Sequence, residues 1–488
     1  MTMSTIVRDT LLIGGEWQKP TSSATLTVVS PSTEQVVGQV PDAGASDVHV
    51  AVGAARRAFD EGPWRGMPVR ERADVLDRAL TLLEARLEEI ARLVVAEMGL
   101  PASVARRKIP GAVSAGRYFL DLARNTPVSD VRRTPFGPAA VLREPVGVVA
   151  SIAPWNGPFN MAVAKIVPAL AAGCSVVYKP APETPLDAFH IAEALTESGL
   201  PPGVFNLVTG GREAGRALVA HPGVDKVSFT GSTAAGREIA RECSGRFTRL
   251  QLELGGKSAA IVLEDADPDT VMRGVAAGLF ANTGQTCSAF SRILVPASRR
   301  DAWTDVLVAA AESFKVGDPF DDTTTMGPLV SHAQRERVLR YVELGWAEGA
   351  MTATGGGVPE DLEVGYYVQP TVFVNAYNSM RIAREEIFGP VATVLTYESV
   401  EEAIRIANDS DYGLHGAVFT EDPALAAKVA RSVRTGTFSI NSFTHNTHAP
   451  FGGVKDSGIG RELGPEGLEA FHELKTVNLT RATEPFFI

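Results

Sequence analysis

Residues 146–179, VGVVASIAPWNGPFNMAVAKIVPALAAGCSVVYK, decide the fold of this 488-residue chain. Positions 148–152 form an apolar run of strand length, positions 161–172 have a helical pattern that stops at Gly173, and positions 175–178 form a second apolar run. A helix between two buried strands is the unit from which parallel sheets are built. The stretch therefore predicts a parallel α/β sheet.

The same alternation continues to residue 254. Further strands are expected at 205–208, 227–230 and 250–254, and further helices at 184–199, 213–220 and 232–243. Thr184 and Pro185 have the residue types of an N-cap and a first helical position. We expect a doubly wound, Rossmann-like sheet, and in such sheets ligands bind at the carboxyl ends of the strands.

The flanking segments have other patterns. Residues 13–41 have the pattern of short strands and turns, and residues 45–125 have leucines at helical spacing. Residues 126–145 are too rich in Pro, Gly and Arg for a helix, so we expect a projecting hairpin. Residues 257–450 predict a second α/β domain. In the tail 475–488, apolar and polar residues alternate as in a strand. A strand needs a partner strand, and another subunit could provide it.

The composition is typical of a packed globular protein, with 45% hydrophobic and 21% charged residues. The net charge is −11 and the basic residues are scattered, which argues against nucleic acid and anionic membranes as partners. The first ten residues do not resemble a signal peptide, and no apolar stretch approaches the roughly 20 residues that span a bilayer. Three cysteines allow no disulfide framework, so we expect a cytoplasmic protein.

A candidate phosphate site lies at 229–233, Phe-Thr-Gly-Ser-Thr, where a strand leads into a helix. Free N–H groups and the helix dipole favour an anion there, although a plain turn explains the segment equally well on its own. The turn at 210–215 does not match the dinucleotide fingerprint G-x-G-x-x-G. Residues 255–258 end like a P-loop, but Gln251 stands where its first glycine is required, so a P-loop is rejected.

Cys287 is the candidate nucleophile. It follows the polar, glycine-containing turn Asn282-Thr283-Gly284-Gln285-Thr286, whereas most lone cysteines are buried and inert. Cys174 stands beside valines and Cys243 late in a helix, and both fit that inert class. A reactive thiol needs access and a nearby base or donor, which the small polar neighbours of Cys287 allow.

Two further polar residues follow predicted strands. Glu253, between two leucines, would resist ionisation and is suited to general-base chemistry near neutral pH. A surface ion pair with Lys257 is the alternative. Asn156 can donate to a developing oxyanion, although an asparagine here is more often a turn former.

Taken together, these segments resemble the aldehyde dehydrogenase superfamily over nearly the whole chain. The resemblance rests on Gly15-Glu16-Trp17, Pro154-Trp155-Asn156, Lys179-Pro180, residues 229–232, residues 253–257, residues 282–287, Glu386-Ile387-Phe388-Gly389-Pro390, Asn441, Pro450-Phe451-Gly452-Gly453 and Ser457-Gly458. It implies that an aldehyde is oxidised to a carboxylic acid through a thioester on Cys287, which is then hydrolysed.

The resemblance also implies the role of each catalytic residue. Cys287 attacks the aldehyde carbon, while Asn156 and the backbone N–H of Cys287 hold the oxyanion. Glu253 activates water, and Lys165 and Glu462 relay protons behind it. The expected cofactor is NAD, with NADP possible. Its implied contacts are Ile152, Trp155, Lys179, Pro182, Gly211, Gly215, Phe229, Gly231, Ser232, Leu254, Gly255, Glu386 and Phe388.

Three modules are implied as well. Residues 1–125 and 146–254 bind the dinucleotide, residues 255–474 form the catalytic domain, and residues 126–145 with 475–488 form an oligomerisation element. A homodimer or homotetramer is expected. No metal is implied.

Two departures from the family pattern bear on specificity. Pro182 stands where a glutamate commonly faces the adenine ribose, which leaves the choice between NAD and NADP open. Gly157 and Ala164 stand where bulky aromatic residues are common, which predicts a roomy aldehyde tunnel. Its mouth is expected at residues 443–448. The predicted pocket residues are Gly157, Ala164, Phe443, His445 and His448.

Other functions fit less well. A cysteine hydrolase needs a histidine base, and none of the eight histidines stands in a matching motif. A CoA-acylating relative does not need Glu253 to activate water. A structural protein on this fold would not need every catalytic position to be present.

Overall fold

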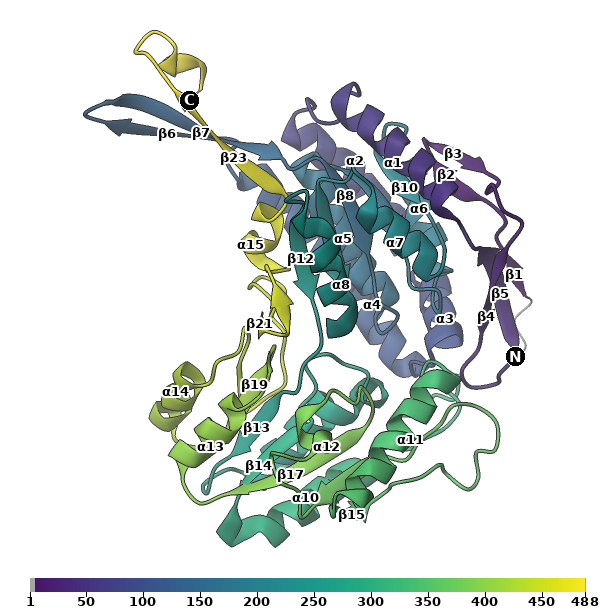
Figure 1. Ribbon diagram of the computed structural model, residues 1–488, viewed down its shortest axis with the longest axis vertical. Helices are drawn as coiled ribbons and strands as arrows, with labels where there is room; N and C mark the ends of the chain where they lie inside the picture. The colour runs from purple at the N-terminus through teal and green to yellow at the C-terminus, as the bar shows by residue number, and fades with distance from the viewer. Residues whose placement is uncertain (1–4, 488) are drawn as a thin grey trace.

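An eight-stranded sheet forms the upper lobe of the computed structural model, which describes residues 5–487 (Figure 1). Its strand order is β22-β12-β11-β8-β9-β10-β2-β3. The strands are β2 (Leu11–Ile13), β3 (Glu16–Gln18), β8 (Val148–Ile152), β9 (Ser175–Lys179), β10 (Phe205–Leu207), β11 (Lys226–Thr230), β12 (Arg249–Glu253) and β22 (Gly458–Ile459). The five central strands are parallel, and the order reverses between β8 and β11. The predicted doubly wound sheet is therefore confirmed.

Helices cover both faces of this sheet, since its strands are buried on both sides. They are α1 (Ala45–Asp60), α2 (Val69–Glu84), α3 (Leu87–Met98), α4 (Ala102–Asn125), α5 (Pro158–Ala172), α6 (Asp187–Glu197), α7 (Arg212–Ala220) and α8 (Thr233–Ser244). Successive residues of β8 serve different cores. Val149 packs with α2–α6, whereas Val148 and Ala150 pack with α1, α7 and α8. A continuous apolar run is what such two-sided burial requires.

A second sheet forms the lower lobe, in the order β15-β16-β17-β14-β13-β19-β20 (Figure 1). Its strands are β13 (Ala259–Val262), β14 (Arg292–Pro296), β15 (Met351–Thr354), β16 (Thr371–Val374), β17 (Val391–Tyr397), β19 (Gly416–Phe419) and β20 (Ser439–Ile440). Its helices are α9 (Pro268–Val275), α10 (Arg300–Glu312), α11 (His332–Ala347), α12 (Arg381–Arg384), α13 (Val400–Asn408) and α14 (Pro423–Ser432). All pairs but β15–β16 are parallel. The chain returns to the upper lobe through β22, which pairs with β12.

Smaller sheets complete the chain. A projecting arm contains β6 (Ser129–Thr134), β7 (Gly137–Pro145) and β23 (His472–Asn478) in the order β23-β7-β6 (Figure 1). A three-stranded sheet is formed by β1 (Ile6–Val7), β5 (Val36–Pro41) and β4 (Thr25–Val29). A pair is formed by β18 (Tyr412–Gly413) and β21 (Val454–Lys455), and the short helix α15 (Gly464–Glu469) precedes β23. Among residues 5–487, no helix is both long and apolar enough to cross a membrane.

Two local predictions need correction. The helix expected from Thr184 begins three residues later, at Asp187, because residues 181–184 form a turn and the carboxylate of Glu97 accepts the N–H of Leu186. The tail strand finds its partner in its own chain, because β23 pairs with β7 along its whole length.

Candidate active site

The predicted site residues meet at one edge of the upper sheet. The register places Ile152 opposite both Lys179 and Phe229, and Thr230 opposite Glu253. These residues end four neighbouring parallel strands. Since the strand order reverses between β8 and β11, this edge is the topological switch point at which doubly wound sheets bind ligands.

A cavity of about 260 Å³ opens at this edge. It is lined by Pro154, Trp155, Asn156, Met161, Thr230, Gly231, Ser232, Leu254, Gly255, Cys287, Gln334, Arg337, Glu386 and Phe388. Nine of these were predicted from the sequence, namely Trp155, Asn156, Gly231, Ser232, Leu254, Gly255, Cys287, Glu386 and Phe388. The cavity therefore joins the candidate nucleophile to the strand ends of the other lobe.

The wall from the lower lobe is held in place by backbone contacts. Glu386 accepts a hydrogen bond from the backbone N–H of Gly256 at 3.0 Å, and Arg337 donates to the backbone oxygen of Glu386. Burial raises the pKa of Glu386 to about 7. Phe388 meets Trp155 edge-on with ring centroids 5.3 Å apart. Aromatic and carboxylate groups from one lobe thus face the strand ends of the other.

Lys179 lies outside this cavity, at the end of β9. Its ammonium donates to the backbone oxygens of Pro180 at 2.9 Å and Gly210 at 2.7 Å. Burial lowers the pKa of Lys179 to about 8, while the carboxylates of Glu183 and Asp42 raise it. Gly215 is beside its side chain, since a Cβ there would lie 3.4 Å from Cε of Lys179.

Pro182 and Gly211 belong to the same outer region. Pro182 is half-buried in the turn that follows β9, and Gly211 is the N-cap of α7 and donates to Asp42 at 2.9 Å. Phe229 also lies outside the cavity, and its ring lies against Gly231. Ser232 is the N-cap of α8, and its hydroxyl accepts from the N–H of Ala235 at 3.2 Å.

Cys287 follows an irregular segment of π and 3-10 turns between α9 and β14. Within it, Asn282 and Thr283 have left-handed backbone angles, with φ of 56° at both. The side chain of Asn156 donates to the backbone oxygen of Gln285 at 2.9 Å, and Asn282 donates to that of Asn156 at 3.1 Å. The segment before the thiol is therefore held directly against the end of β8.

The thiol of Cys287 is neutral at rest. Burial, followed by the negative charges of Glu386 and Glu253, raises its pKa to about 12. Among the three cysteines, Cys287 is half-buried and lines the cavity, while Cys174 and Cys243 are fully buried. Burial raises the pKa of Cys174 to about 11. Only Cys287 is thus placed to react with a ligand in the cavity.

Glu253 is buried, and neither of its carboxylate oxygens has a hydrogen-bond partner within residues 5–487. Burial raises its pKa well above the usual value, Glu462 adds to the rise, and Lys165 and Arg461 oppose it. The alternative of a surface ion pair with Lys257 is wrong, because Lys257 is also buried and its ammonium has no partner among these residues. A buried carboxyl group without partners can accept a proton from a water molecule.

Lys165 and Glu462 form an almost fully buried ion pair next to this carboxyl group. Lys165 also donates to the hydroxyl of Ser228 at 3.3 Å, which in turn donates to Gln251 at 2.9 Å. A chain of polar groups therefore links Glu462, Lys165, Ser228 and Gln251 near Glu253, and within the described residues no hydrogen bond joins Glu253 to it.

The predicted tunnel residues gather beside Ser288. The imidazole of His445 is 3.0 Å from the hydroxyl of Ser288, and burial lowers its pKa to about 4. The ring of Phe443 meets that of His445 at 4.9 Å, and His448 stacks on Tyr118 at 3.9 Å. A neutral, aromatic wall thus stands next to the candidate nucleophile.

The other two predicted pocket residues lie at the start of α5 and on it. A Cβ at Gly157 would lie in ordinary contact with Met161, 3.8 Å away, and the side chain of Ala164 is half-buried. Neither residue lines the cavity at the switch point, so the roomy tunnel stays a prediction.

Sequence analysis missed several residues. Gln334 and Arg337 line the cavity from α11, and their spacing of three places them on one helix face. Gln285 was noted only as a neighbour of the thiol, yet its side-chain oxygen accepts from the N–H of Val330 at 2.9 Å. A helix-face analysis could have found the first two residues, whereas no local pattern indicates the third contact.

The comparisons with known proteins show the family of the chain. Residues 17–477 match the model of the aldehyde dehydrogenase family, and the chain belongs to that family. It is 46% identical over 477 residues to the geranial dehydrogenase of Castellaniella defragrans, covering 97% of this chain and 99% of that one. The family inferred from the motifs is thereby confirmed.

Solved structures give the same result. The aldehyde dehydrogenase of Mycobacterium tuberculosis in complex with NAD+ superposes with a TM-score of 0.96 at 45% identity, covering 98% of this chain and 99% of that one. A cysteine-to-alanine mutant of aldehyde dehydrogenase C from Pseudomonas syringae, solved with NAD+ and octanal, superposes with a TM-score of 0.92 at 41% identity and 96% coverage of both chains. The α/β fold class is confirmed.

Proposed function

We propose that this enzyme oxidises an aldehyde of medium size with NAD, through a thioester on Cys287 that water then hydrolyses. The observation that carries the proposal is the single cavity at the switch point, which is lined by Cys287, Asn156, Glu386 and Phe388. Nucleophile, oxyanion donor and candidate cofactor contacts thus share one space.

The residues around the cavity fit a dinucleotide. Trp155 and Phe388 supply flat apolar walls, and the N-terminus of α8 at Ser232 supplies free N–H groups for a pyrophosphate. Gly255 leaves space, because a Cβ there would collide with the carboxylate of Glu386. We assign the two riboses to Lys179 and Glu386. The bound nicotinamide would supply the hydride acceptor.

Cys287 begins the reaction by attacking the aldehyde carbon. Because its pKa is raised, the proton on Sγ must leave during attack, and we propose that water in the cavity accepts it, so that Glu253 is not needed for this step. The amide of Asn156 has a second N–H beside the one bonded to Gln285, and this N–H can donate to the oxyanion. A free thiol of this kind persists in a reducing compartment, and we propose that the enzyme is located in the cytoplasm.

Hydrolysis follows once the thioester has formed on Sγ. Glu253 takes a proton from water, and the hydroxide attacks the thioester carbonyl, which releases the acid and the thiolate of Cys287. The proton on Glu253 can pass inward, because Glu462 and Lys165 lie directly behind it. This assigns Lys165 and Glu462 as a proton relay.

Removing the oxyanion donor should slow the reaction strongly. In Asn156→Ala we expect kcat to fall about 10²- to 10³-fold, which is the usual loss for one oxyanion donor, roughly 3–4 kcal/mol. The measurement is NADH absorbance at 340 nm under saturating aldehyde. The matched control is Asn160→Ala, on the first turn of α5, where the amide bonds only the backbone of Lys108. Equal kcat values for both variants would remove Asn156 from the mechanism.

The small residues Gly157 and Ala164 suit apolar aldehydes with a long or branched body. The neutral aromatic wall formed by Phe443 and His445 suits the same aldehydes. The relative named a geranial dehydrogenase and the structure solved with octanal support this size class. The test is kcat/KM with NAD over a series from acetaldehyde to octanal, geranial and benzaldehyde. We expect the larger aldehydes to be preferred by at least about tenfold. A preference for acetaldehyde would contradict the substrate class, and no NADH with any aldehyde would contradict the activity.

Residue 182 should determine how well the enzyme uses NADP relative to NAD. A glutamate there would accept hydrogen bonds from ribose hydroxyls and repel a 2′-phosphate, whereas Pro182 does neither, and Lys179 nearby carries a positive charge. In Pro182→Glu we expect the ratio of kcat/KM for NAD over NADP to rise at least about tenfold, which is 1.4 kcal/mol. Pro182→Ala is the control, because it removes the ring without adding charge. An unchanged ratio in Pro182→Glu would show that residue 182 does not face the ribose.

The arm is the element that we assign to self-association. Three large apolar side chains on it and on the tail that follows it are exposed: Phe136, Leu474 and Phe486. Its outer strands β6 and β23 also leave one edge each without a strand partner in the described chain. We expect light scattering to give the mass of a dimer or tetramer and Leu474→Asp to reduce it. A monomeric wild-type protein would refute this assignment.

A further inference from the structure

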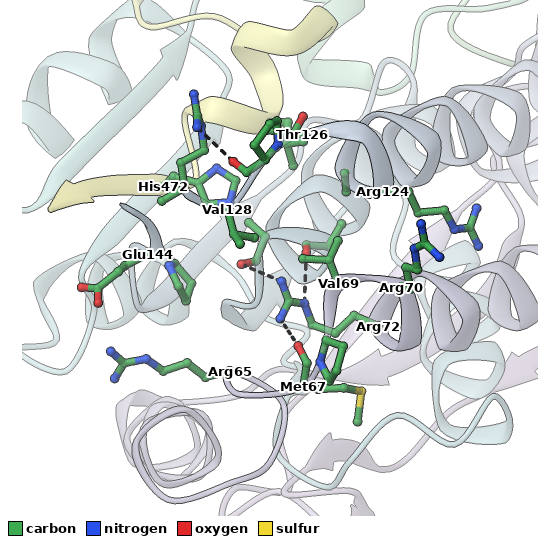
Figure 2. A pocket seen from close by; sticks show the side chains of 18 residues that line it. Arg65, Met67, Val69, Arg70, Arg72, Arg124, Thr126, Val128, Glu144 and His472 are labelled. Atoms are coloured by element: carbon green, nitrogen blue, oxygen red, sulfur yellow. Dashed lines mark hydrogen bonds between the residues drawn. The ribbon is translucent and has the colours of Figure 1, made fainter. Parts of the chain in front are cut away.

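A second large cavity shares no lining residue with the cavity at the catalytic cysteine. It is a cleft of about 630 Å³ between the start of α2, the end of α4 and the base of the arm (Figure 2). Its walls include Met67 and Val69, Thr126 and Val128, and His472. None of these residues belongs to the active site described above.

The cleft is strongly basic. Five arginines line it, namely Arg65, Arg70, Arg72, Arg124 and Arg143. Figure 2 shows Arg65, Arg70, Arg72 and Arg124 around the space, together with His472. The only carboxylate in the lining, that of Glu144, is 3.3 Å from the ammonium of Lys475. This concentration of positive charge contrasts with the net charge of −11 of the whole chain.

Three of the arginines have structural partners. Arg72 donates to the backbone oxygens of Met67, Ala171 and Ala172 and so closes the floor of the cleft. Arg124 pairs with Asp74 and Asp121, and Arg143 pairs with Glu469. Carboxylates compensate the charges of Arg124 and Arg143, and all three arginines shape the walls.

Arg65 and Arg70 are different. Both are exposed, and neither makes an ion pair or a side-chain hydrogen bond within residues 5–487. Arg65 only lies over the ring of Phe59, with its guanidinium carbon 5.0 Å from the ring centre. Both stand next to the first turn of α2, whose N-cap Pro68 provides no side-chain cap. Free N–H groups at a helix start add to the attraction for an anion.

A second observation points to a ligand. His472 has a side chain that is only 10% exposed, and its Nδ1 has no hydrogen-bond partner in the described chain. The nearest carboxylate, that of Glu469, is 3.8 Å away and is bonded to Arg143. Buried polar atoms without partners are rare in folded proteins, and a ligand is one way to satisfy them.

We propose that this cleft binds an organic anion with a carboxylate or phosphate head and an apolar body. The planar guanidinium groups of Arg65 and Arg70 suit either head group. Met67, Val69, Val128 and Leu468 form an apolar wall for the body. The volume lies in the range of about 300–1,000 Å³ that is typical of small-molecule sites and greatly exceeds that of a bare ion. The two sources of such an anion are a carboxylic acid and a phosphate ester.

Calorimetric titration of the full chain, without cofactor or aldehyde, tests the proposal. The probes are octanoate, octyl phosphate and the neutral analogue 1-octanol at low ionic strength. We expect octanoate or octyl phosphate to bind with an affinity that falls as salt is added, since exposed charges are screened. Whichever binds at least tenfold more tightly identifies the head group. Octanol should bind only in the aldehyde tunnel and should be insensitive to salt.

Variants assign the binding to the cleft. In Arg65→Gln/Arg70→Gln we expect the anion to bind at least tenfold more weakly, and in Arg65→Glu/Arg70→Glu not measurably. The matched control is Arg92→Gln, an exposed arginine of α3 outside the cleft, which should change binding less than twofold. Dehydrogenase activity should be unchanged in all three, so a failure here is separate from a failure of the proposed reaction. Equal affinity in wild-type protein and both double variants, or no salt-sensitive binding at all, would overturn the proposal.

Discussion

Cys287→Ala is expected to abolish NADH production, with kcat falling by at least about 10⁴-fold. The thiol is the only nucleophile on the cavity wall that a thioester could form on, and alanine leaves the rest of the wall in place. The measurement is absorbance at 340 nm with the best aldehyde of the series. Binding of NAD, followed by quenching of tryptophan fluorescence, should survive because Trp155 and Phe388 remain.

The two other cysteines provide the control. Cys174→Ala and Cys243→Ala should retain most activity, because both side chains are buried in the apolar cores beside the upper sheet. Cys174→Ala should lower stability by about 1 kcal/mol, since it leaves a small void. Substantial turnover by Cys287→Ala, or its loss in Cys243→Ala, would disprove the thioester mechanism.

Glu253→Gln is expected to give a burst of NADH followed by a stall. Glutamine keeps the shape of the side chain but cannot take a proton from water, so the thioester accumulates. Steady-state kcat should fall about 10²- to 10⁴-fold, the usual range for a lost general base. The matched control is Glu264→Gln, an exposed residue just after β13. Full steady-state turnover in Glu253→Gln would exclude this residue as the base for deacylation.

The pH profile provides an independent measurement of the same group. The pKa of Glu253 is raised by burial, so the carboxylate that accepts a proton is scarce at low pH and becomes more abundant as pH rises. Deacylation in the wild-type enzyme should therefore accelerate as pH rises, and the rise should extend above the range in which an ordinary glutamate titrates. Rapid-mixing kinetics of the phase after the burst would show this. In Glu253→Gln the slope should be lost, and an unchanged slope would assign it to another group.

The pattern of hydrophobic residues was sufficient to predict the upper sheet, because strands that are buried on both faces consist of short apolar runs. The start of α6 was misplaced for a physical reason. Thr184-Pro185 looks like a helix start, but the N–H of Leu186 is taken by Glu97, which is 89 positions away in the chain. The partner of β23 is equally remote, since β7 precedes it by more than three hundred residues. Such long-range contacts have no local signal.

The residues of the site also fall into two groups, those that a local sequence motif indicates and those that only long-range packing brings to the site. Cys287, Glu253 and Asn156 stand in ordered motifs, and the structure brings Cys287 and Asn156 to one cavity with Glu253 close by. Gln334 and Arg337 share one face of α11, which a helix pattern can show, but that this face meets the cavity depends on the packing of the lower lobe against the upper one. The unpartnered carboxylate of Glu253 also becomes visible only when its three-dimensional surroundings are known.

The segment that carries Cys287 is attached to both lobes. Asn156 and Asn282 tie it to β8, and the side chain of Gln285 ties it to Val330 below. A hinge movement between the lobes would therefore stretch these bonds and displace the thiol. The enzyme gains fixed reaction geometry but loses the freedom to open widely, so we expect cofactor and aldehyde to enter while the lobes stay closed. Crosslinking the lobes at their surface should accordingly leave turnover almost unchanged, which distinguishes this enzyme from those that clamp shut around their substrates.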